Sequence, residues 1–231
     1  PMLTIPSELT LYPASVVEQD GTTYCMLRDA DGKRLLGVTG NTDGFVPNAV
    51  TADGLAVCGL TAANARQLRS RLAWASPVAL GLRTSAGFGD RLGVATPGHV
   101  LATQGTGVAP IYAQQSVREN TRTGRTPQNV VDDAMWGVLQ MGWHADWGAD
   151  ADHMKTIADI NPFVDAGYTF FTIDPAEHVD DAAEHADDAT LTEKVAALPW
   201  GALESSVEEM RARYLRSFDL DDRTLTFDEH L

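Results

Sequence analysis

Short apolar runs and polar segments follow one another in a regular order from residue 77 to about residue 175. Four apolar runs have the length of buried strands, namely 78–82, 109–113, 148–151 and 168–173. Each is followed by polar residues and then by a helix-forming segment, and the unit recurs roughly every 30 residues, which suits parallel βα units. The pattern predicts an α/β fold with a parallel, TIM-barrel-like (β/α) sheet.

Polar side chains end each of these predicted strands: Arg83-Thr84-Ser85, Gln114-Gln115, Asp152-His153 and Asp174. In parallel βα folds, ligands bind at the carboxyl ends of the strands, so we expect these residues to share one face of the sheet. The segment from Gln114 to Asn120, which includes Arg118, is dense in hydrogen-bonding groups and suits a sugar-like ligand. Gln114, Gln115, Arg118 and Asp174 are the candidate substrate-binding residues.

Residues 1–76 predict a small α+β segment that precedes the barrel-like part, 77–231. Its apolar runs 22–26 and 35–38 flank Asp29-Ala30-Asp31-Gly32, whose Asp-Gly step suits a hairpin turn. Another buried strand is expected at 54–58, and Thr61 is suited to cap a helix that runs to about Trp74. Nothing in this segment indicates chemistry.

The C-terminal part predicts no further strand of the parallel sheet. Residues 176–189 are acidic and contain His178 and His185, a pattern more typical of a solvated loop than of a metal site. Residues 191–217 have the apolar stripe of a helix. Because a closed barrel needs eight βα units, we expect a partial barrel in an incomplete chain, which joins a missing C-terminal half or self-associates.

Composition narrows the class of protein. The chain has 231 residues, 44% of them hydrophobic, enough for one large domain or a domain with a smaller satellite. No run approaches the roughly 18 apolar residues of a membrane span, and no signal peptide pattern is present, so we expect a cytoplasmic protein. Cys25 and Cys58 each lie in an apolar run and are expected to be buried, reduced thiols.

The formal net charge of −15 excludes two classes of partner. Such a charge repels polyanions, so we expect neither nucleic acid nor an anionic membrane surface to bind. Only three lysines occur, Lys33, Lys155 and Lys194. A small anionic substrate would therefore depend on a few local cations.

Two features of the sequence bear on cofactor binding. The run from Gly87 to Gly93 departs from the dinucleotide fingerprint, because its third glycine comes one residue late and Asp90 stands where a pyrophosphate would approach. Its amides could instead hold a substrate carboxylate or hydroxyl group. His153 alone cannot hold a catalytic metal, which takes about three protein ligands.

Several long motifs together resemble the tagaturonate epimerase family: GLRTSAGFGDRLGVATPGHV, APIYAQQSVRENTRTGRTPQNVVDDAMWGV, WGADADHMK and YTFFTIDPAEHVD. They recur in order over about residues 78–181. The resemblance implies interconversion of tagaturonate and fructuronate with a divalent metal cation. It implies that Asp152 is the proton acceptor and His153 one metal ligand, while the family's glutamate proton donor and remaining histidines have no counterpart here.

The hypothesis is therefore the first part of a (β/α)-barrel sugar-acid epimerase, with a small α+β segment before it. Within enzymes, the alternative is another metal-dependent ketose isomerase or aldolase. From a different class, the alternative is a non-catalytic module that binds sugar acids.

Overall fold

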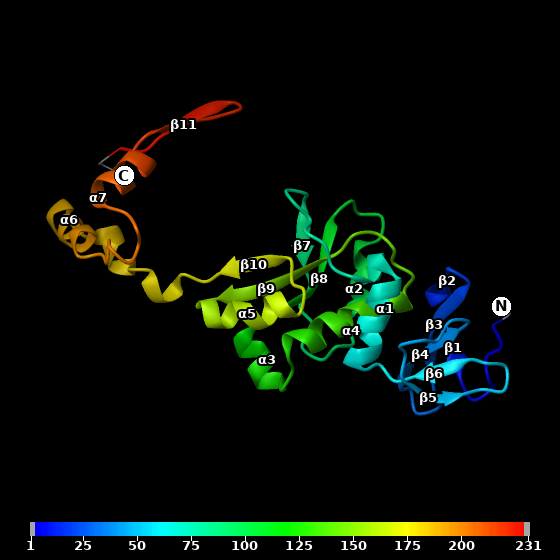
Figure 1. Ribbon diagram of the computed structural model, residues 1–231. Helices are drawn as coiled ribbons and strands as arrows, with labels where there is room; N and C mark the ends of the chain where they lie inside the picture. Colours follow the sequence, from blue (N-terminus) through cyan, green and yellow to red (C-terminus); the bar gives the residue numbers. More distant parts are fainter. Residues whose placement is uncertain (1–2, 229–231) are drawn as a thin grey trace. The chain divides into compact units, whose positions relative to one another are not determined.

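The computed structural model describes residues 3–228. The chain forms two compact units, one that ends at Pro175 and one that begins at Ala176 (Figure 1). The sequence-based division at residue 76 falls inside the first unit and stays a prediction of domain organisation.

The N-terminal part of the first unit is an antiparallel sheet in the order β1-β3-β4-β6-β5, with β2 paired to β3. Its strands are β1 Thr10–Leu11, β2 Val17–Gln19, β3 Thr22–Arg28, β4 Arg34–Thr39, β5 Pro47–Val50 and β6 Ala56–Cys58. The predicted hairpin is confirmed, because β3 and β4 pair across a turn in which Gly32 has a φ of 84°. The predicted cap is also confirmed, since Thr61 accepts a hydrogen bond from the Asn64 amide at the start of α1, Ala62–Arg71.

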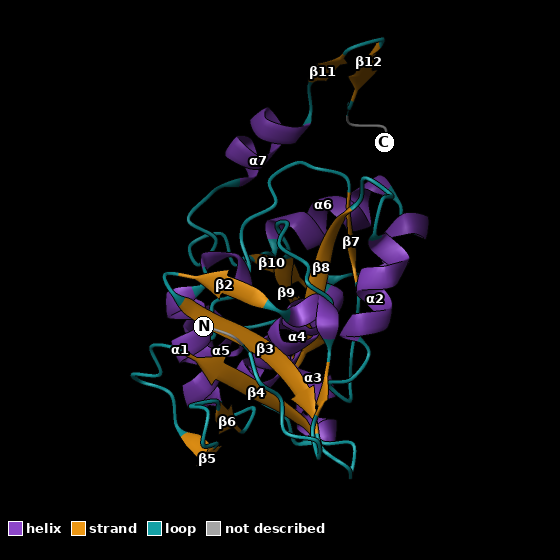
Figure 2. Ribbon diagram, turned by 90° about the vertical axis from the view of Figure 1, so that its right-hand side faces the viewer, coloured by secondary structure: helices purple, strands orange, loops and turns teal. Residues whose placement is uncertain are grey.

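The second sheet is parallel and has the order β10-β9-β8-β7. Its strands are β7 Ser85–Gly87, β8 Ala109–Ser116, β9 Gly148–Met154 and β10 Phe170–Ile173. The helices between them are α2 Thr96–Thr103, α3 Val117–Thr123, α4 Pro127–Gln140 and α5 Ile157–Asp165 (Figure 2). This four-stranded half-barrel with its helices confirms the predicted fold class.

One of the predicted strands is wrong. Residues 78–82 form no strand, and Gly81 has a φ of 62°. The segment instead places Leu80 against Ile111 and Gly148, where the two strands begin. Leu80 therefore packs at the amino end of the sheet, while Ala79, Gly81 and Leu82 are exposed. As a consequence, Arg83 precedes β7 and pairs with Asp146 ahead of β9, at the end opposite to the predicted site.

The two sheets of the first unit share a hydrophobic core. Tyr24 and Met26 of β3 belong to the same buried cluster as Val131 and Trp136 of α4 and Ala149 of β9. An ion pair of 2.6 Å between Arg69 of α1 and Asp132 of α4 joins the two helices. The parallel sheet is thus packed against the N-terminal part of the unit through this shared core.

The second unit differs from the single helix expected over 191–217. It contains the short 3-10 helices η3 Ala176–His178 and η4 Asp181–His185, then α6 Asp188–Ala196 and α7 Val207–Tyr214. Residues 197–206, which include Pro199 and Gly201, separate α6 from α7. The strands β11 Ser217–Leu220 and β12 Arg223–Thr226 form an antiparallel hairpin, and neither of these described strands belongs to the parallel sheet. Residues 225–231 were expected to form no strand, but Leu225 and Thr226 belong to β12, and the part beyond residue 228 lies outside the described residues.

Candidate functional site

The carboxyl ends of β8, β9 and β10 bring three predicted site residues together. Ser116 at the end of β8 is in register with Asp152 on β9, and Asp174 directly follows β10. The Asp174 amide donates a hydrogen bond of 2.9 Å to the Met154 carbonyl, which holds the two strand ends side by side. Asp152, His153 and Asp174 therefore meet at the edge where parallel folds bind ligands.

A β-bulge sets the direction of His153. Phe171 pairs with Ala151 and Ile173 pairs with Met154, so Thr172 alone lies opposite both Asp152 and His153. His153 has a φ of 56°, a left-handed conformation that is uncommon outside glycine. Regular alternation would send the two side chains to opposite faces of the sheet. The bulge instead leaves the His153 Nε2 3.3 Å from Asp152 Oδ2 and the Nδ1 3.6 Å from Asp174 Oδ2.

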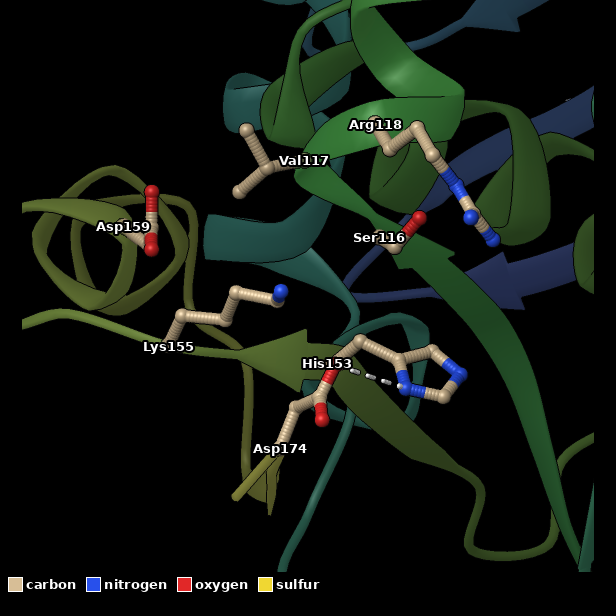
Figure 3. A pocket seen from close by; sticks show the side chains of 7 residues that line it. All are labelled: Ser116, Val117, Arg118, His153, Lys155, Asp159 and Asp174. Carbon is tan, nitrogen blue, oxygen red and sulfur yellow. Dashed lines mark ion pairs between the residues drawn. The ribbon is translucent and has the colours of Figure 1, made fainter. Parts of the chain in front are cut away.

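A pocket of about 410 Å³ opens beside these residues (Figure 3). Its lining comes from the strand ends and from the starts of α3 and α5: Ser116, Val117, Arg118, His153, Lys155, Asp159 and Asp174. Ser116 and Asp159 are fixed by capping boxes, in which each side chain bonds to backbone of the same helix start. Arg118 and Lys155 are the cationic side chains of this lining, in a chain that is strongly acidic overall.

A polar layer lies directly beneath the pocket on the same face of the sheet. Asp150 is in register with Gln114, two residues before Asp152 and Ser116 respectively. The Asp150 carboxylate accepts hydrogen bonds from the Gln114 amide, at 2.9 Å, and from the Thr172 hydroxyl, at 3.0 Å. Burial raises the pKa of Asp150, and the bonds from Gln114 and Thr172 oppose that rise. Asp150 and Thr172 are not among the site residues that the sequence pattern predicts.

Gln115 is not brought into this site. It is 1% exposed, faces away from its neighbour Gln114, and its Oε1 has no hydrogen-bond partner. It lies instead beside the glycine-rich turn, in a hollow of about 500 Å³ that Gly89, Arg91 and Glu119 also line.

The glycine-rich turn after β7 is organised around a buried carboxylate. Asp90 accepts hydrogen bonds from the amides of Leu92 at 3.1 Å, Gly93 at 2.8 Å and Ala95 at 2.6 Å. Burial alone would raise the pKa of Asp90, but these amide bonds outweigh it and lower the pKa. The amides expected to be open to a ligand carboxylate are thus already used by the protein.

The donor types at the strand ends suit a divalent cation only in part. An imidazole and carboxylates are common metal ligands, and His153 lies between two carboxylates. Within residues 3–228, however, no three His, Cys, Asp or Glu side chains are grouped to hold an ion. These residues could therefore supply part of a coordination sphere. No described helix is long and apolar enough to cross a membrane.

Comparison with known proteins identifies related sequences. The family model for tagaturonate epimerase matches residues 12–231. A tagaturonate/fructuronate epimerase of Thermotoga maritima is 42% identical over 177 residues, which are 73% of this chain and 36% of that protein.

Solved structures are also similar. A glycerol-complexed crystal structure of the fructuronate-tagaturonate epimerase of Cohnella laeviribosi is 34% identical, with a TM-score of 0.81 over 95% of this chain and 44% of that one. The native crystal structure of the same epimerase gives the same TM-score over 96% and 45%. The chain thus spans less than half the length of the relatives it matches. With a family match over nearly its whole length, the chain belongs to the tagaturonate epimerase family.

Proposed function

We propose that this chain supplies the proton-accepting part of an enzyme that interconverts D-tagaturonate and D-fructuronate. The observation that carries the proposal is the cluster of Asp152, His153 and Asp174 at the carboxyl edge of the half-barrel, in a chain of this family. Because the chain spans less than half of its relatives, the complete activity is a property of the longer protein.

The residues have distinct roles in this proposal. Asp152 is the general base, since its carboxylate is only partly buried and lies at the strand end. Arg118 binds the substrate carboxylate, because it is an exposed guanidinium at the pocket of an acidic protein. Gln114 and Asp174 bind hydroxyl groups of the sugar acid. Gln115, which lines the neighbouring hollow and not the pocket, is left out of the substrate-binding set.

The position of the inverted carbon decides the reaction route. C4 of a 2-keto uronate is β to both the ketone and the carboxylate, so neither group acidifies its C–H bond. Asp152 therefore removes the proton of the C4 hydroxyl, and the C3–C4 bond breaks to give an aldehyde and an enediolate. The aldehyde turns and the bond forms again on its other face, after which the proton returns from Asp152 to the C4 oxygen.

A divalent cation is part of the proposal, with His153 as one of its ligands. When bound, such an ion supplies positive charge that stabilises developing negative charge on oxygen. Within this chain, Asp174 would orient the imidazole, because its carboxylate lies 3.6 Å from the ring Nδ1 and a nitrogen that binds an ion cannot also donate a hydrogen bond. Other protein ligands would come from outside the described residues.

The proposal also includes the location and the assembly of the protein. We place the enzyme in the cytoplasm, where sugar acids are metabolised, with the small sugar acid as its ligand. The half-barrel is completed by a further segment of the same protein or by self-association. Nucleic acid and membranes are not expected partners of so acidic a chain.

A turnover assay tests the proposal. The full-length protein that contains these residues should convert tagaturonate into fructuronate in the presence of divalent metal. Substrate deuterated at C4 should retain its label, because the C4–H bond is never broken; full loss of the label to solvent would exclude the bond-cleavage route. Binding of tagaturonate by calorimetry without turnover would favour a binding module, and cleavage without recombination would favour an aldolase.

A further inference from the structure

Asp150 is a carboxylate in a place where charge is costly. It is 2% exposed, on the inner strand β9, and its chain neighbours Ala149 and Ala151 face the helix-covered core. Because side chains alternate along a strand, Asp150 faces the other way, to the inner side of the half-barrel. Asp152 lies on this same face, one layer nearer the pocket.

The contacts of Asp150 are with neutral groups. The Gln114 Nε2 donates to Oδ2 at 2.9 Å, and the Thr172 hydroxyl lies 3.0 Å from Oδ1 and 3.2 Å from Oδ2. In the part of the chain that the structure describes, no Lys, Arg or His side chain forms an ion pair with it. A buried carboxylate that is held only by neutral donors contributes little to stability, which argues for another role.

The carboxylate fixes the orientation of both partners. An ionised carboxylate only accepts hydrogen bonds, so the Gln114 amide must turn its nitrogen towards Asp150 and its oxygen away. The amide then lies over Gly87 of β7, where any Cβ would collide with it. The Thr172 hydroxyl donates its hydrogen bond to Asp150, so its oxygen can only accept a hydrogen bond from another group. One hydrogen-bonded layer therefore runs across β8, β9 and β10, with Gly87 of β7 beside the Gln114 amide.

We propose that Asp150 is a positioning residue, which holds the Gln114 amide and the Thr172 hydroxyl so that their oxygens accept hydrogen bonds from hydroxyl groups of the sugar acid. The inference rests on the proposed function and specifies how the substrate of that reaction is oriented. A layer that presents oxygens, with a buried carboxylate behind them, attracts hydroxyl protons and repels a carboxylate. The hydroxyl-bearing carbons therefore lie over this layer, and the carboxylate end lies towards Arg118.

The first test replaces Asp150 in the full-length protein. In Asp150→Asn, the new amide group can donate to Thr172, which reverses the Thr172 hydroxyl and presents a proton instead of an oxygen to the substrate. We expect the KM for tagaturonate and its Kd by calorimetry to rise about tenfold, with a smaller change in kcat. Thr172→Val should raise KM similarly, whereas Thr172→Ser should restore it.

A charge exchange separates positioning from stability. Gln114→Glu alone sets two carboxylates against each other and should lower the melting temperature. Adding Asp150→Asn restores a hydrogen bond between the strands, because the asparagine amide donates to the glutamate. If Asp150 positions Gln114, the melting temperature recovers in the double variant while KM stays raised. If Asp150 were purely structural, both the melting temperature and KM would return to the wild-type values in the double variant.

Tyr168→Phe is the matched control. The Tyr168 hydroxyl is also buried and donates to the Pro127 carbonyl at 3.4 Å, on the helix side of the sheet. Its loss should lower the melting temperature and leave KM unchanged. An unchanged KM and Kd in Asp150→Asn overturns the inference.

The same measurements distinguish this inference from the proposed function. Wild-type protein that binds tagaturonate without turning it over overturns the proposed reaction, while the Kd values still decide the role of Asp150. Wild-type protein that binds neither uronate overturns both.

Discussion

The His153 imidazole lies 3.3 Å from the carboxylate of Asp152, its neighbour in the chain, although both residues belong to strand β9. Adjacent side chains of a regular strand point to opposite faces. The bulge opposite Thr172 removes this restriction and gives His153 a φ of 56°. A local irregularity of the backbone therefore brings the proposed base and the proposed metal ligand together.

Substitution of His153 should separate function from stability. Glycine has no Cβ to strain a left-handed residue, so His153→Gly should be as stable as wild type or up to about 1 kcal/mol more stable. His153→Val places a β-branched residue in the same conformation and should lose roughly 2 kcal/mol. Both variants, and His153→Ala, should lose bound divalent metal. Denaturant unfolding and elemental analysis measure the two effects, and unchanged metal content in all three variants would contradict the role of His153.

Substitution of Asp152 should affect the chemical step alone. Asp152→Asn keeps the size of the side chain and removes the base, so kcat in the full-length protein should fall about a hundred-fold or more. Metal content and the melting temperature should stay near the wild-type values, because Asp152 is only partly buried. A kcat within a few-fold of wild type would assign the proton transfer to another residue.

Local signals in the sequence predicted the elements of the fold correctly wherever one residue type decides the structure. The turn at Gly32 needs a positive φ, and the cap at Thr61 needs a hydroxyl beside free amides. The apolar run at 78–82 shows only that the segment contains apolar residues, and Leu82 is in fact fully exposed. The run does not say whether the backbone joins a sheet, and here Leu80 packs at the amino end of the strands instead.

The candidate site was predictable to the level of strand ends. Asp152, His153, Asp174 and Arg118 meet at one edge because parallel strands end together. The bulge at His153 depends on pairing with β10, which no local pattern encodes. Asp150 was overlooked because it lies among small residues that predict close packing. The sequence signal that indicates a role for Asp150 is the presence of an acidic residue within a strand that is predicted to be buried.

Asp90 should stabilise the glycine-rich turn. In Asp90→Asn, an amide group replaces one of the oxygens that accept the backbone N–H groups of Gly93 and Ala95, which should cost about 1–3 kcal/mol at pH 7. Asp53→Asn, at an exposed aspartate in the turn between β5 and β6, is the control and should change stability by less than about 0.5 kcal/mol.

The effect of Asp90 should also depend on pH. Its pKa is lowered in the folded protein from the ordinary value of 3.8, so its contribution is fully present above that pH and is lost as the pH falls through the folded pKa. Unfolding free energies from pH 7 to pH 2 should converge for wild type and Asp90→Asn. A difference that stays constant with pH would contradict the role of the ionised carboxylate.

The two cysteines should be inert in the folded protein. Burial raises the pKa of Cys25 to about 12 and that of Cys58 to about 11, so neither forms much thiolate at pH 8. A thiol reagent should label neither residue in native protein and both in guanidinium. Since the folded pKa values exceed the ordinary value of 9.0, stability should fall as the pH rises from 9 towards 12, and Cys25→Ala should reduce that fall. Rapid native labelling would contradict the buried positions.

The edge strand β10 should make the 231-residue chain self-associate when it is studied by itself. Phe170 and Ile173 are 52% and 63% exposed, on a strand whose outer edge pairs with no other described strand. Apolar side chains on an unpaired edge favour association with other chains. Sedimentation velocity should show larger species as the concentration rises, and Phe170→Thr with Ile173→Thr should suppress them while preserving strand propensity. Leu82→Thr is the matched control, because Leu82 is fully exposed but lies outside the sheet. Suppression by Leu82→Thr to the same extent would show that general apolar exposure, and not this edge, drives the association.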